Sequence, residues 1–285
     1  MMTIKHLVGL YIMMMVAVSC KQSKTEQVVY SFFTAGHTYG NPNSPQLGLY
    51  PPFIDFFETL NENPKMELGL LTGDVVNHST PEYWDAAQAD ISKLDMPLYI
   101  APGNHDIGDE FLERFEKYYH SFKHNEDLFI ILTPGLDDWN ITGKQLEFLK
   151  NTLDINSPKV DNIFIFLHEL IWWSPDNEYK DIAINYKPHY PGSSNWDDVV
   201  KPLLLSYSNS ITIYAGDLGA TSQVSSVMYD QLDNITLIGS GMGGGKNDNF
   251  IITHVFKDSI SYELICIKGK EPGDMGKLED YNISN

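Results

Sequence analysis

Four clusters of polar residues each follow an apolar run, and their side chains could bind a cation or transfer a proton. The clusters are Thr34-Ala35-Gly36-His37, Gly73-Asp74-Val75-Val76-Asn77, Gly103-Asn104-His105-Asp106 and the single His168 after Ile163-Phe164-Ile165-Phe166-Leu167. A glycine before a polar residue lets the backbone turn sharply at the end of a strand. Carboxylate, amide and imidazole groups that converge in one cleft are typical ligands of a divalent metal. We therefore expect a metal site built from these clusters.

The elements that must position the clusters alternate along the chain as in an α/β domain. The sequence predicts strands at 28–34, 68–72, 97–101, 128–132, 162–167, 211–215, 235–238, 250–256 and 260–267. It predicts helices at 53–60, 81–94 and 109–119, and a fourth helix that begins after Thr142 and ends near residue 153. Thr80 and Thr142 are the expected N-caps of the second and fourth helices. Each cluster then lies in the loop that leaves the C-terminal end of a strand, where open α/β sheets bind their ligands.

The order and spacing of the clusters resemble those of the calcineurin-like metallophosphoesterases, from about residue 28 to residue 267. The most specific match is Gly103-Asn104-His105-Asp106, which Gly73-Asp74 precedes at the spacing usual in that family. The resemblance implies an α/β fold, a four-layer αββα sandwich of two mixed β-sheets flanked by helices. It also implies that Asp74 bridges two metal ions and that Asn104 and His168 bind the second ion.

The same resemblance gives His105 and Asp106 a catalytic role and not a metal-binding one. In the family, the histidine lies beside the phosphate and protonates or stabilises the leaving oxygen, which suits an imidazole near its own pKa. Asp106 would orient this histidine. The reaction implied is the hydrolysis of a small phosphoester by water.

This sequence departs from the family pattern at three ligand positions. Ala35 stands where the first aspartate belongs, and Gly216-Asp217-Leu218-Gly219 stands where the family has Gly-His-x-His. The first metal would retain only His37 and Asp74, and two protein ligands are few for a stable site.

We therefore expect one divalent ion in a reduced site. Its ligands would be Asp74, Asn104, His168 and Asp217, with His37 nearby as a weak ligand or a contact to the phosphate. A carboxylate in place of an imidazole makes the ligand set harder, which favours Mn²⁺, Mg²⁺ or Ca²⁺ relative to Zn²⁺ and leaves Fe and Zn open. One ion can still polarise a phosphoryl oxygen, although the clamp formed by two ions would be lost.

Two alternatives to this enzyme stay open. A degenerate member of the family could bind a phosphorylated or glycan ligand without hydrolysis. A complete two-metal site could instead take its missing ligands from elsewhere, for example from His78 or His189.

Other groups near the clusters could contact a substrate. Trp172 and Trp173 follow His168 closely and could stack on a sugar or a base, although packing in the core explains them at least as well. The run from Gly239 to Gly245 before Lys246 lacks the spacing and the Ser or Thr of a phosphate-binding loop, so we expect a mobile loop near the cleft.

The composition of the chain narrows the class of partner. Its 285 residues, 42% of them hydrophobic, suffice for one large domain. Acidic residues outnumber basic ones by 38 to 19, and Arg114 is the only arginine. Such a surface repels polyanions, so we expect no nucleic-acid partner.

The N-terminus resembles a bacterial lipoprotein signal. Residues 1–19 form the expected signal peptide, because Lys5 and His6 precede an apolar run too short to span a bilayer. The motif Ala17-Val18-Ser19-Cys20 resembles a lipobox, which implies a lipid on Cys20, a tether over 20–27, a domain over 28–270 and a loose tail over 271–285. We expect an exported protein of the cell envelope, periplasmic or outer-membrane, that touches the membrane only through this anchor. A cleaved signal without lipid, or an uncleaved anchor, is the alternative.

Overall fold

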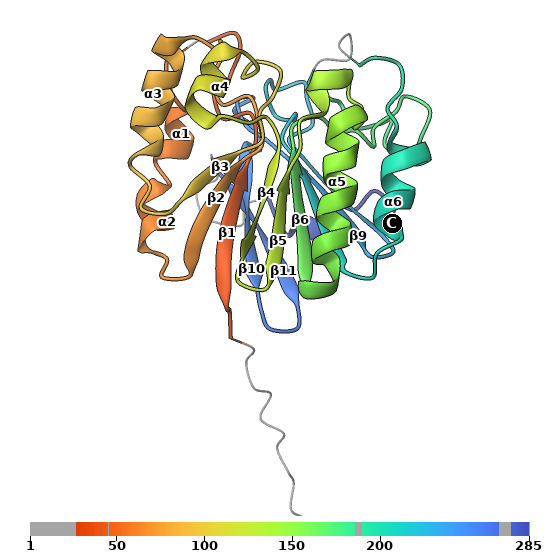
Figure 1. Cartoon of the computed structure of the whole chain (residues 1–285). Coiled ribbons are helices and arrows are strands. Elements are labelled where there is room, and N and C mark those ends of the chain that lie inside the picture. Colours follow the sequence, from red (N-terminus) through yellow and green to blue (C-terminus); the bar gives the residue numbers. More distant parts are fainter. Residues whose placement is uncertain (1–26, 45, 186–189, 268–274, 285) are drawn as a thin grey trace, which may run out of the picture.

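The computed structural model describes residues 27–44, 46–185, 190–267 and 275–284. The signal peptide, Cys20, most of the tether and His189 lie outside the described residues, so the predictions made for them stay predictions. The described part confirms the α/β fold, with two mixed β-sheets flanked by helices (Figure 1). No described helix has both the length and the apolar sequence that a membrane crossing requires.

The first sheet has five strands, and its core strands run parallel. Its order is β11 (Ile260–Cys266), β10 (Asn249–Val255), β1 (Tyr30–Ala35), β2 (Met66–Leu71) and β3 (Leu98–Ile100). β1, β2 and β3 are parallel, whereas β10 pairs antiparallel with both of its neighbours. The helices on its outer side are α1 (Pro51–Ile54), α2 (Phe57–Glu62), α3 (Pro81–Ile91) and α4 (Asp109–Phe115).

The second sheet has six strands, with antiparallel strands only at its two edges. Its order is β4 (His120–His124), β5 (Asp127–Ile131), β6 (Asn162–Leu167), β7 (Ser210–Ala215), β9 (Ile235–Ser240) and β8 (Val227–Leu232). The four inner strands are parallel. α5 (Gly143–Asn156) and α6 (Lys201–Leu205) cover the outer side of this sheet (Figure 1).

Three hydrophobic cores hold the layers together. Phe32 and Phe129 belong to the core between the two sheets. The next residue of β1, Phe33, points the other way and packs in the core that includes Trp84 of α3. Ile130 of β5 likewise faces the third core, which α5 closes. Because both faces of the inner strands are buried, their sequences are nearly continuous apolar runs.

The structure adds two strands that the apolar runs did not predict. β4 and β8 are the two edge strands of the second sheet, and polar residues interrupt the apolar pattern of each. In β4 all residues are at least partly exposed, whereas in β8 the buried Asp230 and the exposed Gln231 interrupt the pattern. The helix predicted at 53–60 is divided into α1 and α2. Thr80 and Thr142 do precede α3 and α5, but neither side chain makes the predicted capping hydrogen bond.

Part of the segment expected to be a loose tail packs against the domain. A 3₁₀-helix spans Leu278–Tyr281, and the side chain of Leu278 is fully buried. The N–H of Ile283 then donates to the carbonyl oxygen of Tyr229 at 3.1 Å, and Asn282 pairs with the same residue. The described end of the chain therefore lies along edge strand β8.

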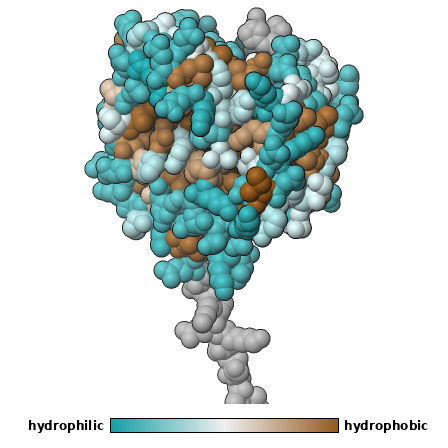
Figure 2. Space-filling model, viewed as in Figure 1, coloured by the Kyte–Doolittle hydropathy of each residue, from teal (hydrophilic) through white to brown (hydrophobic). Residues whose placement is uncertain are grey.

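Polar loops gather at one end of the two sheets. β1 enters from the lower end in Figure 1, so that His37 follows it at the upper end, where α3, α4 and several connecting loops lie. Hydrophilic side chains cover much of the face seen in Figure 2, and hydrophobic ones appear in separate groups.

Candidate active site

A cavity of about 500 Å³ opens among the loops that follow β1, β2, β3, β5, β6 and β7. Five of the predicted site residues line it, namely His37, Asp74, Asn104, His105 and Asp217. The other two, Asp106 and His168, are fully buried behind the wall. The structure thus brings the four sequence clusters and the loop after β7 to one place.

Asp74 lies between two histidines. Its Oδ2 is 3.5 Å from Nε2 of His37, and its Oδ1 is 3.3 Å from Nε2 of His168. Both Asp74 and His37 have left-handed backbone conformations, with φ of 51° and 54°, which are uncommon for residues other than glycine. One carboxylate oxygen therefore faces each imidazole, as expected of a bridging ligand.

His168 is oriented by its backbone contact on one side and faces carboxylates on the other. Its Nδ1 is 2.9 Å from the carbonyl oxygen of Thr72, which can only accept, so Nδ1 carries the hydrogen. The buried Nε2 has no hydrogen-bond partner and faces Oδ1 of Asp74 and, at 3.7 Å, Oδ1 of Asp217. Burial disfavours a charged ring, but the two carboxylates outweigh it and raise the pKa of His168 well above its usual value. A cation is therefore favoured among these three groups.

The spacing of these three groups fits a metal ion closely but not completely. Ligand atoms about 2.1 Å from a shared ion stand about 3 to 3.5 Å apart. The separations of 3.3 and 3.7 Å around Nε2 of His168 are near this range. As the described side chains stand, however, no group of three or more His, Cys, Asp or Glu residues forms a finished metal site. Binding an ion would require the carboxylate of Asp217 to move slightly inward.

Asn185 holds Asp217 in this arrangement. Its Nδ2 donates to Oδ1 of Asp217 at 2.8 Å, while its Oδ1 accepts from the N–H of Ala220 at 3.0 Å. Asn104 has an exposed side chain on the cavity wall, and the described contacts include no bond from it to Asp74 or His168. No sequence pattern indicated Asn185, because it lies in a long loop without a recognisable motif.

His105 is oriented by a main-chain group and not by Asp106. Its Nδ1 lies 2.7 Å from the carbonyl oxygen of Asn77, which fixes the hydrogen on Nδ1 and leaves Nε2 as the atom that can gain a proton. The ring lies on the cavity wall with the ring of Tyr39 5.3 Å away, centroid to centroid. The orienting role expected of Asp106 therefore belongs to Asn77.

Asp106 instead ties two loops together. Its Oδ1 accepts from the N–H groups of Val75 and Val76 at 2.9 and 3.0 Å, and its Oδ2 accepts from the N–H of Gly103 at 2.9 Å. Burial, and then the charge of Asp74, raise the pKa of Asp106 to about 7 against the effect of these donors. The carboxylate thereby fixes the loops after β2 and β3 relative to each other.

Backbone packs closely around Gly219, one of the two positions, with Ala35, where the family resemblance places missing ligands of a first metal. Ala35 is fully buried, and Gly219 has a φ of 81°. A Cβ at position 219 would lie 2.4 Å from the carbonyl carbon of Gly241 and 2.6 Å from the nitrogen of Met242. The glycine run before Lys246 is therefore closely packed against Gly219 at Gly241 and Met242, and its mobility stays a prediction.

The other residues predicted to contact a substrate or a metal do not line the cavity where the structure describes them. Trp172 and Trp173 are 1% and 2% exposed and belong to the core beneath the second sheet, so they do not face the cavity. His78 is exposed, packs against the ring of Tyr83 and does not line the cavity. Glu169, which the sequence analysis overlooked beside His168, is part of the cavity wall.

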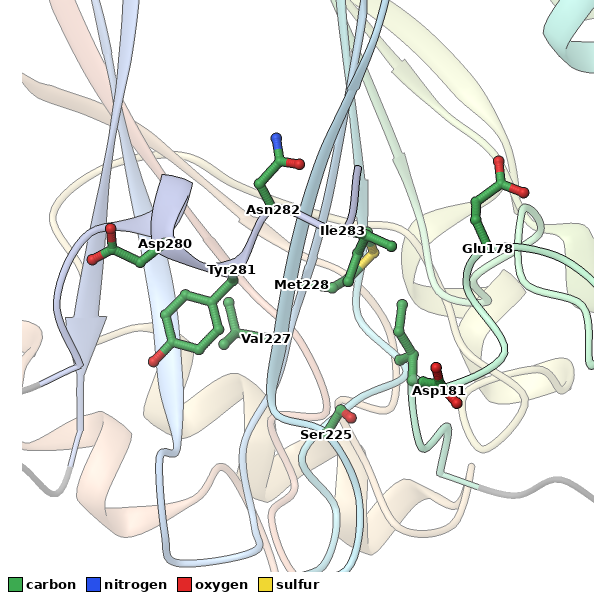
Figure 3. Close-up of a pocket in the computed structure, with 10 residues that line it drawn as sticks. Glu178, Asp181, Ser225, Val227, Met228, Asp280, Tyr281, Asn282 and Ile283 are labelled. Atoms are coloured by element: carbon green, nitrogen blue, oxygen red, sulfur yellow. The ribbon is translucent and has the colours of Figure 1, made fainter. Parts of the chain in front are cut away.

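A second cavity, of about 420 Å³, lies between the end of the chain and the loop at 178–182 (Figure 3). Three carboxylates, those of Glu178, Asp181 and Asp280, stand around a floor that includes Val227 and Met228. None of the described residues that line it is a histidine. We therefore place the candidate active site in the first cavity.

Comparison with known proteins agrees with this choice. A family described as calcineurin-like phosphoesterase matches residues 37–218, more than half of the chain. A protein of Arcobacter nitrofigilis named "Probable glycerophosphodiester phosphodiesterase GpdQ" is 33% identical over 90 residues, which are 30% of this chain and 32% of that protein. The matched part thus spans about a third of the relative's length.

Solved structures with a similar arrangement are distant in sequence. Vps29 of Chaetomium thermophilum is 12% identical with a TM-score of 0.36, over 83% of this chain and 96% of that one. A 5'-nucleotidase candidate of Staphylococcus aureus is 12% identical with a TM-score of 0.43, over 85% of this chain and 55% of that one. We draw no functional conclusion from either.

Proposed function

The chain belongs to the calcineurin-like phosphoesterase family, and from this premise we propose that it hydrolyses a small phosphoester with the help of one divalent ion. The observation that carries the proposal is the unpartnered Nε2 of His168, which faces the carboxylates of Asp74 and Asp217. A buried imidazole nitrogen set between two carboxylates is suited to bind a cation, either a proton or a metal ion that replaces the proton.

The residues that would hold the ion are Asp74, His168 and Asp217, and Asn104 is near enough to the cavity to complete the set. A divalent ion here would supply Lewis-acid polarisation of a phosphoryl oxygen. The Nε2 of His105, fixed by the contact of its Nδ1 with Asn77, would give a proton to the leaving oxygen. His37 lines the same cavity and would contact the phosphate.

One ion, and not two, is supported by the packing at the other half of the site. Ala35 offers no ligand, and any side chain at Gly219 would meet the backbone of Gly241. His37 and the second oxygen of Asp74 would be the only protein ligands among the described residues there. Two ligands rarely hold a metal in a stable site.

Activity assays should begin with phosphodiesters, because the Arcobacter nitrofigilis relative carries the name of a phosphodiesterase. Chromogenic diester and monoester substrates would be offered with a panel of divalent metals to the wild type and to His105→Ala and Asp74→Ala. His78→Ala is the matched control, since its ring is exposed outside the cavity. We expect metal-dependent turnover that both site variants lose and the control retains. Elemental analysis should give one ion per chain, and a reproducible content of two would refute the single-metal site.

We also propose that the protein is exported to the cell envelope and anchored by a lipid on Cys20. The lipobox-like motif supports this proposal. Mass spectrometry of the mature N-terminus from a bacterial host tests it, and an unmodified Cys20 would exclude the anchor.

A second candidate function is binding without hydrolysis. The incomplete ligand set of the described residues favours it. If the folded protein shows no turnover with any metal but binds a phosphorylated or glycan ligand, this candidate replaces the first.

A further inference from the structure

Glu169 has a buried carboxylate oxygen that no group in the described structure satisfies. The residue is 2% exposed, lines the cavity, and its Oε2 has no hydrogen-bond partner. Leaving a buried carboxyl oxygen without a partner is costly, so such a group indicates a partner that the protein acquires in its functional state.

The neighbouring loop is shaped around this carboxylate. A Cβ at Gly135 would lie 2.4 Å from Oε1 of Glu169, so only a glycine lets the loop approach so closely. Gly135 and Trp139, in the same loop, also line the cavity. The carboxylate is thus held against this loop, which with Glu169 forms one end of the wall.

The charge of the cavity indicates which partner is suitable. Asp74, Asp138, Glu169 and Asp217 all line it, and no lysine or arginine is among its described lining residues. The only arginine, Arg114, is engaged elsewhere, with Asp85 at 2.8 Å. A group that carries a positive charge would therefore be attracted to this wall, whereas a second anionic group would be repelled.

We infer that the alcohol part of the substrate carries an ammonium group, which Glu169 binds while the phosphate lies near His105. This inference rests on the proposed phosphoesterase function and names its substrate class, a phosphoester of an amino alcohol. The ammonium group supplies the donor that Oε2 lacks. Glu169 is then a specificity residue, because it contacts the part of the substrate that distinguishes one ester from another.

The test compares two ligands of equal size. In the monomethyl ester of 3-aminopropylphosphonate, a C–P bond replaces the scissile ester bond, and the butyl analogue has a methyl group in place of the ammonium. Calorimetry with the full chain, Mn²⁺ and either ligand measures the ratio of the two dissociation constants. We expect the wild type to prefer the amino ligand roughly tenfold to a hundredfold.

Glu169→Gln keeps the shape of the side chain and should reduce this preference to about equal binding. Glu113→Gln, an exposed change outside the cavity, should leave the preference at its wild-type value. Gly135→Ala should also reduce it, since the new methyl group displaces the carboxylate.

Equal binding of the two ligands by the wild type, no binding of either, or an unchanged preference in Glu169→Gln would each overturn the inference. The chromogenic assay separates this result from the proposed function. Turnover without ammonium preference removes only the inference, and ammonium preference without turnover supports it while favouring a binding protein.

Discussion

Replacing Asp106 should destabilise the protein more than it slows any chemical step. Its carboxylate is fully buried and accepts three main-chain N–H groups, from Val75, Val76 and Gly103. Each buried donor left without a partner costs about 1 to 3 kcal/mol. Asp106→Ala orphans all three, and allowing for partial relaxation we expect a loss of about 3 to 6 kcal/mol in the free energy of unfolding.

Asp106→Asn tests how much of this stability comes from a single hydrogen bond. An asparagine keeps one oxygen for Val75 and Val76 but turns an NH₂ group toward the N–H of Gly103, so one bond is lost. We expect a cost of about 1 to 3 kcal/mol. Asp109→Ala is the control: the side chain is exposed in the first turn of α4, and its loss should cost less than about 1 kcal/mol.

Urea unfolding at about pH 8 measures these differences, above the pKa of about 7 of the buried carboxyl group. A loss below about 1 kcal/mol in Asp106→Ala would refute the loop-tying role. So would full stability of Asp106→Asn together with a large fall in turnover, because that pair of results belongs to a catalytic carboxylate.

Three further predictions follow from the same geometry. Gly103→Ala should weaken Mn²⁺ binding roughly tenfold or more, because the new methyl group would lie 2.4 Å from Oδ1 of Asp74. Calorimetry measures the Mn²⁺ affinity of the variant, and an affinity equal to that of the wild type would contradict the prediction. Asn185→Ala should weaken Mn²⁺ binding roughly tenfold to a hundredfold by freeing Asp217, whereas wild-type affinity would show that Asp217 is not a ligand. Burial raises the pKa of Glu169 from 4.5 to about 7, so chelator-treated wild type should lose up to about 3 kcal/mol of stability as the pH rises through this interval. Glu169→Gln should not show this loss in urea unfolding, and parallel pH profiles of the two proteins would contradict the shift.

The parts of the fold that the sequence predicted are those buried on both faces. β6 was evident because Ile163 to Leu167 is an unbroken apolar run, which only an inner strand requires. The edge strands β4 and β8 were not, because polar residues interrupt the apolar pattern, at partly exposed positions in β4 and at the buried Asp230 and the exposed Gln231 in β8. The spacing of apolar residues likewise does not indicate the division between α1 and α2.

The candidate site was predictable where a residue directly follows a strand. His168 directly follows β6, and His37 and Asp74 come two and three residues after β1 and β2. β1 and β2 are neighbours in the first sheet, and the packing of the second sheet against it brings His168 to Asp74. Asn185 could not be found in this way, since the fold of a long loop decides where its side chain lies. Hydrogen-bond partners were also beyond the sequence. The family resemblance implied that Asp106 orients His105, whereas in the structure Asp106 accepts from backbone N–H groups and His105 contacts the carbonyl oxygen of Asn77.

The left-handed backbone at Gly219 bears on how this chain could change over evolutionary time. A histidine at 219 would be disfavoured twice, by its φ of 81° and by the nearby backbone of Gly241. The β9–β10 loop would have to move first, and that movement alone adds no ligand. A histidine at 219 therefore requires coordinated changes in two loops. Close packing of these two glycine-rich loops thus makes this position hard to change by single mutations.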